Sequence, residues 1–144
     1  MNKGIEFIRK FAQAYRISCR PLCQKLKIPQ TAFDILMFLA NNPEYKTASD
    51  IVEVRGIKAN LVSVNVDKLV RDGYLKRENA KDDRRKTLLI CTDKAQAIIK
   101  EGQKLQETFM KQLFEDTDEQ TQKIFFILIE SMEKNLEKIL KEDK

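Results

Sequence analysis

Apolar residues recur at helical spacing through the first part of the chain. Between residues 5 and 26 they lie three or four positions apart, as on one face of a helix, at Ile8, Phe11, Ala12, Tyr15, Cys19, Leu22 and Leu26. Pro21 has no backbone N–H and is expected to kink this segment or to divide it into two helices. A second helix is predicted for residues 30–41, ended by Asn42 and Pro43, with these residues facing inward: Phe33, Leu36, Met37 and Ala40.

Two further helical patterns follow at residues 47–55 and 58–72. The first opens on Thr47-Ala48-Ser49-Asp50, which resembles a capping box. The second ends before Gly73, which suits the left-handed position after a helix, and its expected buried stripe is Val62, Val66, Leu69 and Val70. Two helices joined by a tight turn that contains Gly56 indicate a helix-turn-helix.

After Gly73 the pattern changes to that of strands. Residues 74–78 and 87–91 are predicted strands on either side of a charged segment, which gives a hairpin with an exposed tip. Residues 92–114 and 118–144 are predicted long helices. The last presents one apolar face, formed by Phe125, Ile129, Met132, Leu136 and Ile139. The predicted fold class is mostly α with a small β-hairpin wing, in one domain: a winged helix-turn-helix lobe at about residues 30–95, with helical regions at about 1–26 and 96–144.

Composition narrows the class of protein. The chain of 144 residues has a net charge of +5 and contains no histidine, the commonest general base and nitrogen ligand for metals. It has four well-separated glycines and therefore lacks a glycine-rich phosphate loop. We expect no enzymatic activity, no metal site and no cofactor. Its apolar runs are far shorter than the about 20 residues that a bilayer requires, and the N-terminus does not resemble a signal peptide, so a soluble cytoplasmic protein is expected.

The charge distribution indicates a division of labour along the chain. Residues 1–45 and 46–86 each carry a net charge of +4, whereas residues 87–144 carry −3. The basic part is suited to an anionic polymer such as double-stranded DNA, and the last part to protein contacts.

The helix at residues 58–72 offers side chains suited to the major groove. Asn60, Ser63 and Val64 lie near its start, where they can reach an adenine, several base edges and a thymine methyl group, respectively. Phosphate contacts, which fix the register of a protein on DNA, are expected from Lys58, Lys68 and Arg71. A polar helix face is more often merely solvated, so the prediction depends on the order of all the elements.

The predicted hairpin tip adds a second basic surface. Arg84, Arg85 and Lys86 are placed to enter a minor groove or to follow phosphates. Asp83 is unfavourable beside DNA unless it holds an arginine in a fixed rotamer, which is the role that we assign to it. Charged hairpin tips also occur simply because they are soluble.

The ordered set of motifs resembles the MarR family of bacterial transcription regulators. The strongest part of the resemblance runs from about Ile28 to Ala95. It is carried by four stretches: Phe33-Asp34-Ile35-Leu36-Met37-Phe38-Leu39, Ala48-Ser49-Asp50-Ile51-Val52, Val66-Asp67-Lys68-Leu69-Val70-Arg71-Asp72-Gly73-Tyr74-Leu75 and Asp83-Arg84-Arg85-Lys86-Thr87-Leu88, the last followed by Thr92 and Lys94. It implies a homodimer that binds pseudo-palindromic operators, often with effector-driven release. Asp83 and Arg85 take the family's Asp-x-Arg positions. Dimer contacts are expected from both ends of the chain, at Ile8, Tyr15, Phe125, Ile129, Leu136 and Ile139.

Departures from the family pattern leave some details open. Lys58 stands where a serine-like cap is common, and Ala95 replaces a frequent glycine.

The family resemblance also implies a small aromatic or lipophilic effector, held in a crevice between the dimer helices and the DNA-binding lobe.

Two alternative functions remain. Cys19 and Cys23 are candidate redox residues whose pKa Arg16 and Arg20 would lower, although a free cysteine is usually a small buried hydrophobe. A winged helix module that binds protein is the other alternative. Its binding would depend little on salt, unlike that of a DNA-binding protein.

Overall fold

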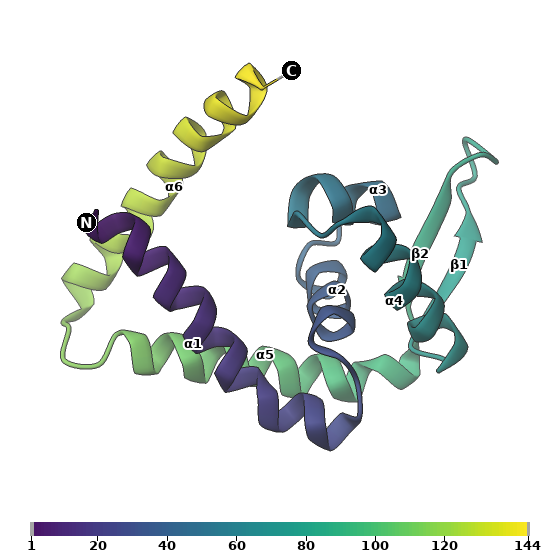
Figure 1. Ribbon diagram of the computed structural model, residues 1–144, viewed down its shortest axis with the longest axis horizontal. Coiled ribbons are helices and arrows are strands. Elements are labelled where there is room, and N and C mark those ends of the chain that lie inside the picture. Colours follow the sequence, from purple (N-terminus) through teal and green to yellow (C-terminus); the bar gives the residue numbers. More distant parts are fainter. Residues whose placement is uncertain (1, 144) are drawn as a thin grey trace. The chain divides into compact units, whose positions relative to one another are not determined.

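The computed structural model describes residues 2–143, which divide into two compact units at residues 109 and 110. The first unit contains α1 (Lys3–Leu26), α2 (Gln30–Asn41), α3 (Ala48–Asp50) with its π-helical continuation η1 (Ile51–Arg55), α4 (Ala59–Arg71), β1 (Leu75–Asn79), β2 (Thr87–Cys91) and the 3-10 turn η2 (Asp93–Ala95) (Figure 1). Helix α5 (Gln96–Leu113) passes from the first unit into the second, which also holds α6 (Glu119–Glu142). The predicted class, mostly helical with a two-stranded wing, is confirmed.

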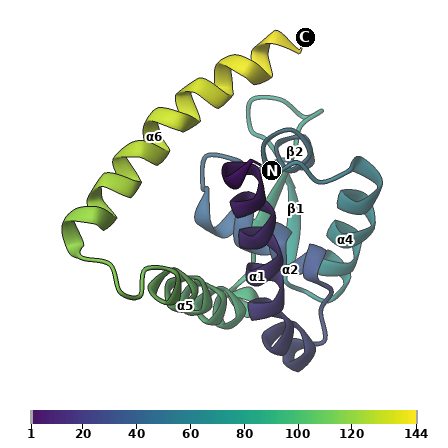
Figure 2. The ribbon, with the colours of Figure 1, turned by 60° about the vertical axis from the view of Figure 1, so that its left-hand side comes forward.

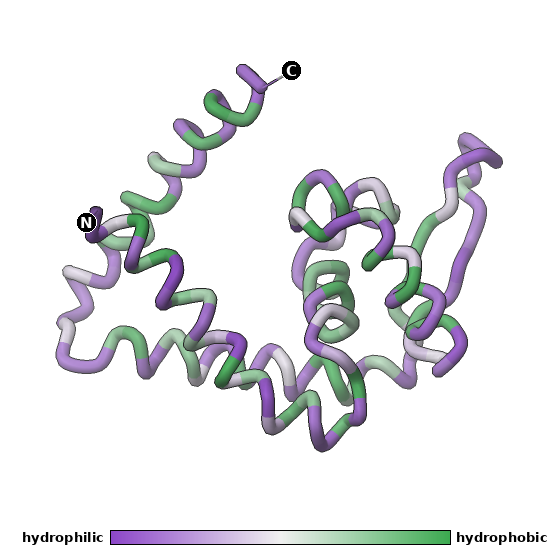
Figure 3. The backbone as a smooth tube through the Cα atoms, viewed as in Figure 1, coloured by the Kyte–Doolittle hydropathy of each residue, from purple (hydrophilic) through white to green (hydrophobic). Residues whose placement is uncertain are grey.

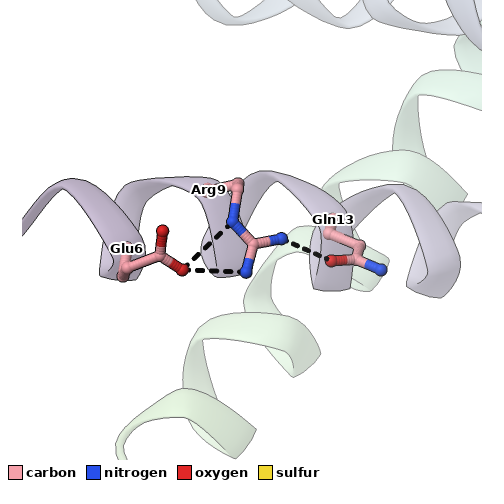
Figure 4. Close-up of polar contacts among 3 residues, drawn as sticks. All are labelled: Glu6, Arg9 and Gln13. Atoms are coloured by element: carbon pink, nitrogen blue, oxygen red, sulfur yellow. Dashed lines mark hydrogen bonds and ion pairs between the residues drawn. The ribbon is translucent and has the colours of Figure 1, made fainter. Parts of the chain in front are cut away.

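Helix α1 is continuous through Pro21, so the expected division into two helices is wrong. Proline removes one backbone donor, but Cys19 and Cys23 on either side of it are buried in the core and hold the segment in place. On the exposed side of the helix, Arg9 donates hydrogen bonds to Glu6 and to Gln13 (Figure 4). Such exposed pairs contribute little to stability, so apolar burial is what fixes α1.

Helix α2 is the centre of the core. Phe33, Leu36 and Met37 are buried as predicted, but the expectation of one inward face is too narrow. The helix is covered on nearly all sides, because these residues are buried as well: Ala32, Ile35, Phe38 and Leu39. Neighbouring elements α1, α4, η1 and β2 all contact it.

The two strands pair antiparallel, from Leu75 opposite Cys91 to Asn79 opposite Thr87. The first strand starts one residue later than predicted, because Tyr74 completes the end of α4: its amide donates to the Leu69 carbonyl. A bond from the Leu89 amide to the Lys46 carbonyl (2.7 Å) ties β2 to the segment before α3. Figures 1 and 2 show the hairpin beside α4.

The second unit has its own aromatic cluster. The Phe114 ring lies 5.2 Å from that of Phe125 and 5.6 Å from that of Phe126, and Asp118 caps α6 by accepting from the Thr121 amide. Along α6, hydrophobic and hydrophilic residues alternate with helical spacing (Figure 3). None of the α6 side chains is buried within this chain. No helix between residues 2 and 143 is long and apolar enough to span a membrane.

Candidate nucleic-acid interface

The helix-turn-helix is built by local capping signals. Thr47 Oγ1 accepts from the Asp50 amide, and the Asp50 carboxylate accepts from the Thr47 amide, both at 3.1 Å. This is the predicted capping box. Gly56 then adopts a φ of +78°, a left-handed conformation that glycine takes without strain. The chain therefore turns sharply after η1 and enters α4 through Lys58.

Helix α4 has the predicted buried and exposed faces. Val62, Val66 and Leu69 are buried, Val70 is half-buried, and four of the predicted contact residues are exposed: Asn60, Ser63, Val64 and Arg71. Lys58 is also exposed and caps α4 without a side-chain hydrogen bond. Lys68 differs, because its Nζ lies 3.0 Å from Asp72 Oδ2 on the same helix.

The end of α4 is fixed to the base of the hairpin. Gly73 has a φ of +83° and, as predicted, supplies the left-handed residue after the helix. Thr92 Oγ1 donates to the Gly73 carbonyl at 2.6 Å, and Lys94 Nζ donates to the Asp72 carbonyl at 2.7 Å. A cation at the C-terminal end of a helix is also favoured by the helix dipole. These bonds set the direction in which the hairpin leaves α4.

An ion pair that the sequence analysis missed joins the helix to the wing. Arg77 on β1 donates to the Asp67 carboxylate on the exposed side of α4. Both residues are visible in the sequence, but nothing local indicates that they meet. Asp67 therefore has a structural partner on a face that otherwise suits DNA.

The hairpin tip is basic and exposed. Arg84, Arg85 and Lys86 are all solvent-exposed, and 93% of the Arg85 side chain is accessible. Asp83 Oδ1 accepts from the Arg85 amide at 3.0 Å and lies 3.3 Å from Arg85 Nε. The predicted contact between Asp83 and an arginine is thus present, and it orients the base of the Arg85 side chain.

The described part of the first unit has hollows on both sides of β2 that could hold a small molecule. One, of about 500 Å³, opens between α3, α4 and the hairpin, with Ser49, Ser63 and Arg77 in its wall. The other, of about 460 Å³, lies between α2, β2 and α5, and is lined among others by Tyr45, Lys46, Cys91 and Lys100. The residues that line the second hollow could not be named from the sequence, because they come from three separate elements and from the loop after α2.

The cysteines of α1 do not have the environment that redox sensing requires. Cys19 and Cys23 are buried, and burial raises the pKa of both thiols, that of Cys23 to about 11. The expectation that Arg16 and Arg20 lower these pKa values is therefore wrong. Thiols in this state carry little of the reactive thiolate. Within residues 2–143, no three acidic or cysteine side chains gather as a metal site.

These features define the class of protein: a winged helix-turn-helix with an exposed second helix and a basic wing. Residues 26–86 match the model of the MarR family. The resemblance predicted from the sequence is thereby confirmed for this segment. The family that this segment matches is one of transcription regulators, in agreement with the predicted class of protein. No curated protein matches the chain.

Solved structures show the same fold over nearly the whole chain. A MarR transcriptional regulator from Methanosarcina mazei Go1 is 20% identical, with a TM-score of 0.81 over 96% of this chain and 94% of that one. A MarR family regulator from Listeria monocytogenes, complexed with 26mer DNA, is 16% identical, with a TM-score of 0.82 over 94% and 90%. Bordetella bronchiseptica BpsR, whose DNA binding is regulated by 6-hydroxynicotinic acid, is 17% identical, with a TM-score of 0.69 over 92% and 93%.

Proposed function

We propose that the protein is a transcription repressor that binds double-stranded DNA as a homodimer at pseudo-palindromic operators. The observation that carries this proposal is the exposed face of α4, with Asn60, Ser63 and Val64 free of contacts that the fold needs. The basic tip of the wing lies in the same compact unit. Together they offer one surface for the major groove and one for the adjacent backbone.

Dimer formation is proposed from apolar side chains that the single chain leaves exposed. Ile8 is 64% exposed, Leu136 55% and Ile139 62%. Tyr15 and Phe125, also predicted at the interface, already pack within the chain on Phe109 and Phe114, respectively. Exposed apolar surfaces of this extent mark interaction sites in soluble proteins.

Release from DNA is proposed to follow the binding of a small aromatic or lipophilic effector. The crevice between α2, β2 and α5 supports this proposal, because Leu39, Ile99 and Tyr45 give it apolar walls and Lys46 and Lys100 lie at its rim. To test this, small aromatic acids such as 6-hydroxynicotinic acid would be titrated into the complex of the protein with DNA, and a loss of DNA affinity would be measured.

The first test is fluorescence-anisotropy binding to the DNA upstream of the protein's own coding region, in a salt titration with excess competitor DNA. The proposal expects tight binding that resists competitor and weakens log-linearly with salt. Weak binding that the competitor abolishes would reject a specific operator there. Binding to a protein partner with little salt dependence would favour the alternative function, a winged helix module that binds protein.

The wing prediction concerns Arg85. Arg85→Ala should weaken binding to every DNA sequence and reduce the slope of log affinity against log salt by about one, because one phosphate contact is lost. Lys134→Ala, which removes a cation from exposed α6, is the charge-matched control and should leave the slope unchanged. If both variants behave like the wild type, the wing does not contact DNA.

The base-reading prediction concerns Asn60. Asn60→Ala should cost about 1–3 kcal/mol at one base pair of the operator and relax the preference there, because asparagine pairs with adenine through two hydrogen bonds. Binding to operator variants with each base substituted in turn gives the measurement. A uniform loss at all positions would assign Asn60 to the backbone instead.

A further inference from the structure

A half-buried carboxylate lies beneath the turn of the helix-turn-helix. Asp34 is on α2, and only 17% of its side chain is exposed. Burial raises the pKa of this group, while Gln30, Arg55 and Arg16 oppose that effect. Since a charged group inside a protein is unfavourable unless it is paired, the partners of Asp34 decide what it does.

The two carboxylate oxygens have different partners. Oδ1 accepts from Gln30 Nε2 at 2.9 Å, one helical turn earlier on α2. Oδ2 lies 3.5 Å from a terminal guanidinium nitrogen of Arg55. Gln30 is itself fixed from the other side, because its Oε1 accepts from the Cys23 thiol of α1 at 3.9 Å. Asp34 is thus oriented by the partly buried Gln30 on one side and directed to Arg55 on the other.

Arg55 occupies a special place in the chain. It is the last residue of η1 and directly precedes Gly56, at which the chain turns toward α4. The Gly56 amide donates to the Ile51 carbonyl and so closes η1. A side chain that ties Arg55 to α2 therefore holds the turn from which the recognition helix starts.

We propose that Asp34 is a positioning residue for DNA recognition, acting through its ion pair with Arg55 to fix the helix-turn-helix turn on α2. This inference deepens the proposed function and rests on it. Asp34 contacts no DNA in this role. Its effect on binding comes from holding α4 in the orientation that the major groove accepts.

The effect of Asp34→Asn on DNA affinity tests this proposal, because a purely electrostatic effect and a positioning effect would change the affinity in opposite directions. Asp34→Asn removes a negative charge from a DNA-binding lobe and should strengthen binding slightly if Asp34 has no positioning role. If the pair positions the turn, the same variant should weaken binding about threefold to tenfold, with the salt slope unchanged. Glu44→Gln removes an exposed carboxylate from the same lobe and provides the control for charge.

Arg55→Gln and the double variant complete the cycle. Arg55→Gln should also weaken binding, and Asp34→Asn with Arg55→Gln should be no weaker than the worse single variant, because both remove one interaction. Binding that is unchanged or tighter in Asp34→Asn, together with a reduced salt slope in Arg55→Gln, would make Arg55 a phosphate contact and overturn the proposal.

Amide hydrogen exchange in the free protein tests the positioning role of Asp34 without relying on DNA binding. Asp34→Asn should speed exchange of the Gly56 amide at least severalfold relative to the wild type, without a matching change in the core amides of α2. If the wild type binds no DNA, the proposed function fails, and this measurement still decides whether the pair holds the turn. Unchanged exchange at Gly56 would reject the pair as a positioning device.

Discussion

Replacing Ile139 with aspartate is expected to convert the proposed dimer into a monomer and to weaken binding to the proposed operator by about 100-fold or more, because two half-sites would then be bound independently. Ile139 is 62% exposed in the single chain, and Leu136 on the same face is 55% exposed. A carboxylate at such a position must be desolvated when the interface closes, without a partner to compensate it. Leu136→Asp should have the same effect.

Sedimentation velocity at micromolar protein gives the oligomeric state, and circular dichroism checks that the helices are retained. The control is Lys134→Asp, which places the same carboxylate two residues before Leu136, about half a turn around α6, at a position that is exposed in the chain. That variant should remain dimeric. A dimer that survives Ile139→Asp and Leu136→Asp would place the interface elsewhere in the chain.

Gly102→Ala is expected to destabilise the fold by about 1–3 kcal/mol, the usual cost of overpacking a core. Alanine is the better helix former by about 1 kcal/mol, so a change governed by local propensity would have the opposite sign. An added Cβ at Gly102 would lie 2.5 Å from Met37 Sδ, 2.9 Å from its Cε and 3.1 Å from Phe33 Cζ. Because Gly102 has no side chain, Met37 and Phe33 of α2 can pack directly against the backbone of α5 at this position.

Chemical denaturation at fixed protein concentration measures the effect. Lys104→Ala, at an exposed position of α5, is the control and should change the free energy of unfolding little. Met37→Val in the Gly102→Ala background should recover part of the loss, because it removes the atoms that the new Cβ meets. A stabilised Gly102→Ala variant would show that α2 and α5 can separate without cost.

Much of the architecture is encoded in short-range signals, and these were predictable. The capping box at Thr47 and Asp50, the left-handed Gly56 and Gly73, and the helical spacing of buried residues in α4 each act within one or two turns. Local hydrogen bonds and backbone preferences suffice to specify them. The exposed polar face of α4 and the basic wing followed from the same patterns.

Other features depend on contacts between segments that are far apart in the chain, and the sequence does not show these contacts. Pro21 suggested a break in α1, but burial of the residues around it keeps the helix continuous. Cys19 and Cys23 lie near two arginines in sequence, yet the core surrounds them and raises the pKa of their thiols. In both cases tertiary packing outweighed a local rule.

The ion pairs made by α4 and by the residue before its turn belong to this second group. Arg77 pairs with Asp67, ten residues earlier in the sequence, and Arg55 at the end of η1 pairs with Asp34 of α2. The amino-acid sequence by itself determined the order of the elements and the exposed face of α4, because these follow from local periodicity. Only the tertiary structure decided which charges meet and how closely α2 and α5 approach, because both depend on packing between segments far apart in the chain.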